Sequence, residues 1–135
     1  MKRVTKKLFC IIFLLSISIL SLFAEISGSG SLTDPFILSD KNDWDTFADN
    51  INMGINADKY YKLSDSFNNS AEPITKMAGN NNSYPFQGSF DGNGKSLVVN
   101  ISETGSVAPF SWVKDASFVN LCIEGNIEIQ GDSMG

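Results

Sequence analysis

The chain has 135 residues, with 10 Lys and Arg against 15 Asp and Glu and no His. This length fits a single domain, and 42% hydrophobic with 19% charged residues is ordinary globular composition rather than that of a disordered chain. The absence of His excludes enzymes that use an imidazole as a base or metal ligand.

The first 24 residues have the pattern of a secretory signal peptide. Four basic residues precede the apolar run Leu8–Phe23, and Ala24 supplies the small residue that signal cleavage requires. We therefore expect cleavage after Ala24 and a mature protein that is secreted or held at the cell surface. An uncleaved membrane anchor is the alternative, because the apolar run is close to the lower limit of spanning length.

Removal of this leader changes the charge and the cysteine content. Four of the ten basic residues are lost, which leaves six Lys against fifteen acids, a formal net charge of −9, with no Arg. Such a chain is repelled by nucleic acids, so we expect no nucleic-acid partner. Cys122 is the one remaining cysteine; the mature chain has no internal disulfide.

Residues 25–33 are rich in Ser and Gly and predict a flexible lead-in segment, and residues 34–135 form the predicted domain. The domain opens with an Asp-Pro turn into a short strand at Phe36–Leu38. Asn42 or Asp43 then caps a helix that ends near Gly54. The apolar residues of this helix recur at helical spacing: Trp44, Phe47, Ala48 and Ile51.

The rest of the chain predicts short strands separated by Gly, Asn, Asp and Ser. Asp91–Gly94 is the strongest predicted turn, because Gly and Asn readily adopt positive φ. The predicted strands are Tyr60–Leu63, Ser96–Ile101, Phe118–Glu124 and Asn126–Ile129.

Similar residues recur 24 positions apart, which indicates an internal repeat. The matching pairs are Pro85-Phe86 with Pro109-Phe110, Leu97 with Leu121, and Val99 with Ile123. Short strands repeating at this interval favour a parallel β-helix, in which equivalent strands stack and their inward side chains form columns. An antiparallel β-sandwich with hairpin turns is the alternative fold.

The order of the motifs resembles the N-terminal part of secreted bacterial proteins with GLUG-type repeats. The motifs that carry the resemblance are Gly28-Ser29-Gly30, Asp34–Leu38, the helix, Tyr60–Leu63, the Phe86–Lys95 segment (F-x-G-x-F-D-G-N-G) and Asn120-Leu121. The resemblance implies a mainly β, right-handed parallel β-helix with one short N-terminal capping helix. It also implies a surface or adhesin-like role with no catalytic residues in the repeat. The chain departs from the family signature at Val107–Phe110.

Acidic residues are numerous but predict no catalytic or metal site. Asp40, Asp43 and Asp45 stand around a helix start, where capping and the helix dipole explain them better than a calcium ion does. Asp91 has no second acid within ten residues on either side, whereas glycoside hydrolysis uses a pair. We therefore expect no catalytic residue, no metal ligand and no cofactor.

The sequence predicts a non-enzymatic scaffold or adhesin-like protein that contacts host proteins, glycans or other copies. A carbohydrate-active β-helix enzyme and a truncated relic of a longer repeat protein are the alternatives. Gly131–Gly135 reads as the start of another repeat, so we expect an incomplete repeat domain and self-association through an open C-terminal rung. The aromatic residues predicted to contact a partner are Tyr60, Tyr61, Tyr84 and Trp112.

Overall fold

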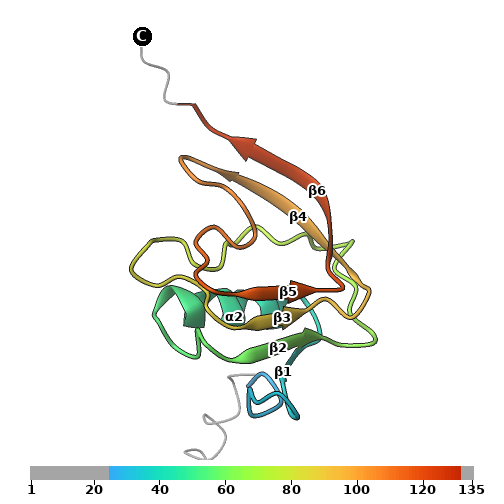
Figure 1. Cartoon of the computed structure of the whole chain (residues 1–135). Helices are drawn as coiled ribbons and strands as arrows, with labels where there is room; N and C mark the ends of the chain where they lie inside the picture. Colours follow the sequence, from blue (N-terminus) through green and yellow to red (C-terminus); the bar gives the residue numbers. More distant parts are fainter. Residues whose placement is uncertain (1–24, 132–135) are drawn as a thin grey trace, which may run out of the picture.

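The computed structural model describes residues 25–131 and is mainly β, with one helix in that range. Figure 1 shows β1, β2, β3 and β5 stacked in that order, with β4 and β6 beyond β5. They are β1 (Phe36–Leu38), α2 (Lys41–Asn52), β2 (Tyr60–Leu63), β3 (Ser89–Asp91), β4 (Ser96–Glu103), β5 (Ser117–Val119) and β6 (Cys122–Ile129). The predicted signal peptide lies outside the described residues.

The strands form two sheets, and within each sheet neighbouring strands pair in parallel. One sheet has the order β1-β2-β3-β5, and the other joins β4 to β6. Sequence neighbours in the four-stranded sheet are therefore also neighbours in space, and each is joined to the next by a long connection. The alternative antiparallel sandwich requires hairpin pairing, which none of these strand pairs has.

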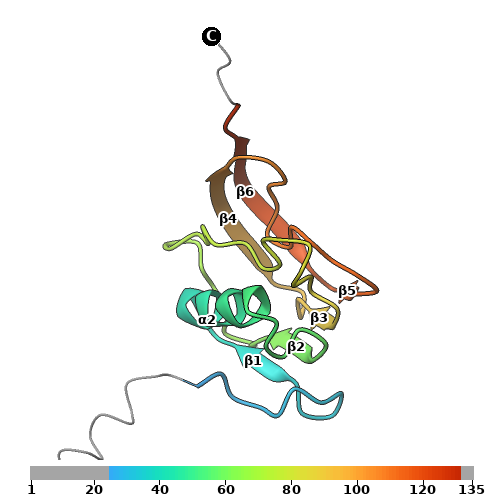
Figure 2. The ribbon, with the colours of Figure 1, turned by 90° about the vertical axis from the view of Figure 1, so that its left-hand side faces the viewer.

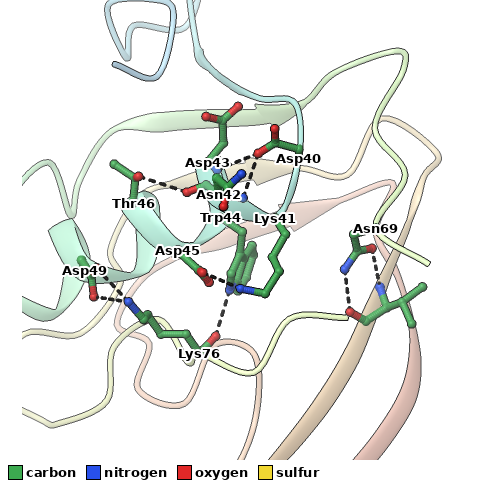
Figure 3. Close-up of polar contacts among 11 residues, drawn as sticks. Asp40, Lys41, Asn42, Asp43, Trp44, Asp45, Thr46, Asp49, Asn69 and Lys76 are labelled. Atoms are coloured by element: carbon green, nitrogen blue, oxygen red, sulfur yellow. Dashed lines mark hydrogen bonds and ion pairs between the residues drawn. The ribbon is translucent and has the colours of Figure 1, made fainter. Parts of the chain in front are cut away.

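α2 forms where the apolar spacing predicts it. Its N-cap is Asp40 rather than the predicted Asn42 or Asp43, because the Asp40 carboxylate accepts hydrogen bonds from the main-chain N–H groups of both residues (Figure 3). The helix ends at Asn52, two residues before Gly54, whose φ of 73° suits glycine. The four predicted apolar residues, Trp44, Phe47, Ala48 and Ile51, are all fully buried.

α2 lies across the inner face of the four-stranded sheet, as Figures 1 and 2 show. In the sheet, Tyr61, Phe90 and Phe118 occupy matching positions on β2, β3 and β5 and form an inward column. The Phe47 ring lies 4.6 Å from that of Tyr61 and 5.7 Å from that of Phe90. The helix thus seals the aromatic part of the core.

The predicted 24-residue interval does not match the observed pairing of β4 with β6, so this prediction is wrong. Leu97 pairs with Ile123 rather than Leu121, and Val99 pairs with Gly125 rather than Ile123, so the interval between β4 and β6 is two residues longer. The predicted strand Phe118–Glu124 is divided, because Asn120 adopts a φ of 51° and the chain turns there from one sheet to the other.

Residues 25–33 fold back over β1. The Ile37 N–H donates to the Ser27 carbonyl at 2.8 Å, and the Tyr60 N–H donates to the Gly30 carbonyl at 3.1 Å. Gly30 has a φ of 73°, and a Cβ there would stand 2.4 Å from the Phe36 ring. This segment therefore covers the first edge of the stack.

Candidate functional site

A groove of about 420 Å³ crosses the outer face of the four-stranded sheet, on the side away from α2. We call it the outer groove. Its walls combine aromatic, aliphatic, hydroxyl and charged side chains. The residues that line it are Leu32, Pro35, Tyr60, Tyr61, Lys62, Ser89, Phe90, Asp91, Ser117 and Val119.

The strand register builds this groove from two columns of outward residues. Side chains alternate between the two faces of a strand, and Tyr61 and Phe90 point into the core. The first outward column is Tyr60, Ser89 and Ser117, and the second is Lys62, Asp91 and Val119. Equivalent side chains therefore follow one another along the stack at the strand spacing of about 4.8 Å.

Asp91 is fixed in place by the turn that follows it. Its Oδ1 accepts from the Asn93 N–H at 2.8 Å and from the Asn120 side-chain amide at 3.1 Å. The hydrogen bond from Asn93 holds the pKa of the Asp91 carboxyl below its usual value; Asn120 and the charge of Lys62 act in the same direction, against a smaller opposing effect of burial. The carboxylate thus stays ionised and oriented at neutral pH.

Three other polar side chains of the outer groove have open hydrogen-bonding capacity. Within residues 25–131, no hydrogen bond or ion pair joins the Lys62 ammonium, the Ser89 hydroxyl or the Ser117 hydroxyl to another group. Their donors are unused by the fold and face the groove's side of the sheet.

The two adjacent tyrosines of β2 have opposite roles. Tyr60 is 36% exposed and lines the outer groove, as a surface-contact residue should. Tyr61 is only 2% exposed, and its hydroxyl donates to the Asn56 carbonyl at 3.0 Å. Burial, and secondarily the charge of Asp58, raises the pKa of the Tyr61 hydroxyl. The prediction of Tyr61 as a surface contact is wrong, because strand alternation turns its ring into the core.

Tyr84 and Trp112 are exposed but lie elsewhere. Both side chains are close to half exposed, and neither residue lines the outer groove. Tyr84 lies over Gly54, where an added Cβ would stand 2.8 Å from its ring. The structure therefore does not bring the four predicted aromatic residues together in one site. The sequence analysis missed four polar residues of the outer groove: Lys62, Ser89, Asp91 and Ser117.

A second hollow, of about 400 Å³, lies where the interior of the stack opens beyond β5 and β6. Inward residues of these strands are exposed because no strand covers them in the described part of the chain: Phe118, Ile123 and Ile127 are 39%, 45% and 43% exposed. We call the apolar surface formed by Phe118, Ile123, Ile127 and Ile129 the end face.

The acidic residues around α2 are occupied by the fold. Asp40 caps the helix, Asp45 pairs with Lys41, and Asp49 pairs with Lys76 at 2.8 Å (Figure 3). Asp43 accepts a hydrogen bond from the Ser39 N–H at 2.7 Å. Across residues 25–131, no group of three or more Cys, Asp or Glu side chains is placed to hold a metal ion. In the same range no helix has the length and apolar character needed to cross a membrane.

Comparisons with family models, with curated proteins and with solved structures found no match to the chain. The resemblance to GLUG-type repeat proteins therefore remains a prediction from the motifs.

Proposed function

We propose that the protein is an exported, non-enzymatic scaffold of the adhesin-like kind, built as a parallel β-helix, that contacts glycans or proteins at the surface of the cell. The observation that carries this proposal is the outer groove, in which unused donors, one oriented carboxylate and an exposed Tyr ring share one rigid sheet face.

The strand order supports the β-helix. Strands β1, β2, β3 and β5 stack in chain order and in parallel, and the β4-β6 sheet makes a second side. Isolated parallel bridges between Ile74 and Val99, Ala78 and Phe110, and Phe86 and Val113 extend the same stacking to the segments between the strands. This arrangement is typical of a solenoid whose rungs pair with their neighbours.

The acid content of the groove supports a binding role over a catalytic one. Asp91 is the single carboxylate among the lining residues, whereas the usual glycoside hydrolases place two carboxyl groups on either side of the scissile bond. Asp91 also spends one of its oxygens on the turn.

Self-association through the end face is part of this proposal, with a second copy of the chain as the partner. The opposite end of the stack is covered, since Ser27 pairs with Ile37 on β1. Two copies can therefore bury this apolar surface by meeting end face to end face, which gives a closed symmetric dimer rather than a filament. An antiparallel β6 pair that sets Ile123 against Ile127 also sets Asn126 against Glu124 and avoids opposing two Glu residues.

The experiment that tests the proposed function follows the full chain, with a C-terminal tag, in a bacterial host that exports it. We expect the protein outside the cytoplasm with an N-terminus at Glu25, and we expect cells that display it to adhere to glycan-coated or matrix-protein-coated surfaces more than cells without it. Cytoplasmic protein that retains Met1, or display without any gain in adhesion, would overturn the proposal.

A further inference from the structure

We infer that the outer groove is a binding site for an uncharged saccharide, which lies across the strands with one sugar ring against Tyr60. The inference rests on the proposed function, because it names the ligand class of the same surface. It is carried by the two outward columns on β2, β3 and β5 and by the polar groups that the fold leaves unused in them.

The main chain of the groove floor is already paired. β2 and β3 are inner strands of the four-stranded sheet, and their N–H and C=O groups face neighbouring strands on both sides. An extended peptide recognised by strand addition needs a free sheet edge. A ligand in the outer groove is therefore recognised by side chains and not by the main chain.

These side chains match the hydroxyl groups of a sugar. The free Asp91 oxygen accepts hydrogen bonds, the Lys62 ammonium donates them, and the hydroxyls of Ser89 and Ser117 do both. They project from adjacent strands about 4.8 Å apart. Such a ladder of acceptors and donors suits a ligand that carries several hydroxyl groups along its length.

The apolar part of the groove suits the face of a sugar ring. The main chain of Tyr60 is fixed, because its N–H donates to the Gly30 carbonyl, and Leu32 and Pro35 line the same groove. A tyrosine ring gives an apolar face with little conformational entropy to lose on binding. The C–H face of a pyranose packs on such a ring while its hydroxyls reach the polar column.

The charge of the groove selects an uncharged ligand. Lys62 and Asp91 are neighbours across β2 and β3, so their charges balance locally. A uronate or sulfated glycan would be attracted by Lys62 but repelled by Asp91 and by the exported chain, whose six Lys against fifteen acids give a formal net charge of −9. A positively charged amino sugar would be attracted by Asp91 but repelled by Lys62.

The test is an array of immobilised neutral and acidic glycans probed with the full exported protein, followed by calorimetric titration of the soluble form of the neutral glycan it retains. We expect a neutral oligosaccharide to be retained over its uronate analogue, and Tyr60→Ala and Lys62→Met each to weaken its binding by about tenfold or more. Tyr84→Ala and Lys114→Met are matched controls, since both residues are exposed and lie outside the groove; they should bind as the unaltered protein does.

Each other outcome overturns the inference. Failure to retain any glycan, preference for acidic glycans, or equal effects of the groove variants and their controls would show that the outer groove does not bind an uncharged saccharide. Adhesion of displaying cells to protein-coated surfaces, unaffected by Tyr60→Ala, would at the same time leave the proposed adhesin function standing. Absence of both glycan retention and adhesion would remove the two together.

Discussion

The side chain of Asn69 pairs with the main chain of Val98 in both directions, as a strand would (Figure 3). Its Nδ2 donates to the Val98 carbonyl at 2.7 Å, and its Oδ1 accepts from the Val98 N–H at 3.0 Å. Asn69 is only 3% exposed, and five residues later Ile74 continues the pairing at Val99. An amide side chain therefore caps the edge of β4 where the preceding segment is not yet extended.

Replacement of this amide by a carboxylate tests the pairing. Asn69→Asp removes the donor to Val98 and places a charge in a buried position, so we expect the free energy of unfolding at pH 7 to fall by about 2–3 kcal/mol. Urea unfolding measures the loss, and part of it should return in acid, where the protonated group can donate again. Asn82→Asp is the control, since Asn82 is exposed; an equal loss there would contradict the assignment.

Trp44 and Trp112 provide a matched pair for the core. Trp44 is fully buried, and its Nε1 donates to the Lys76 carbonyl at 2.9 Å, whereas Trp112 is 42% exposed. We expect Trp44→Phe to cost about 2–4 kcal/mol, because it leaves both a cavity and an unpaired carbonyl. Trp112→Phe should change stability by less than about 0.5 kcal/mol. Thermal and urea unfolding, followed by far-UV circular dichroism, compare the two; similar losses would argue against the packing of α2.

Asp91 makes the stability of the fold depend on pH in the acidic range. Because the folded state holds the pKa of Asp91 below its usual value of about 4, ionised Asp91 stabilises the fold at neutral pH. This stabilisation is lost as the pH falls below about 4 and through the lowered folded value. The urea midpoint should therefore decrease in this range less steeply for Asp91→Asn than for the unaltered chain. Asp34→Asn removes an exposed charge outside this turn, and a parallel flattening there would point to net charge instead.

The end face predicts a specific change in association. Ile127 points toward the open interior, whereas Asn126 beside it points outward. Ile127→Lys should weaken dimer formation by about tenfold or more, because it buries an unpaired charge in an apolar contact. Asn100→Lys adds the same charge at an exposed outward position of β4, away from the β6 contact, and should leave the dimer intact. Sedimentation equilibrium decides between them, and a dimer indifferent to Ile127→Lys would place the contact elsewhere.

Local patterns in the sequence were enough to find several elements. The spacing of Trp44, Phe47 and Ile51 predicted the buried face of α2, and Tyr60–Leu63 is a strand with the predicted limits. The Asp91–Gly94 turn also forms, with positive φ at Asn93 and Gly94. Each of these depends on residues close together in the chain, where periodicity and turn preference act directly.

Features that depend on register could not be predicted in this way. The repeat of similar residues suggested Leu121 opposite Leu97, but the turn at Asn120 shifts the pairing to Ile123. The outer groove follows from the same register, because it decides which residue of each strand stands beside Lys62. The pairing of Asn69 with Val98 joins residues 29 positions apart and has no local signal.

Agreement between chain order and stacking order also has a mechanical consequence. Among the strands of residues 25–131, β6 is the outermost of the β4-β6 sheet. A force applied from the C-terminal side therefore loads β6 first and the neighbouring strands after it. Phe90 and Phe118 are paired across 28 residues, so opening one rung lengthens the chain by about 95 Å at about 3.4 Å per residue. Under tension the protein should therefore unfold in discrete steps, each of which extends the chain by the length of one rung. α2 and the covered edge at β1 should unfold last.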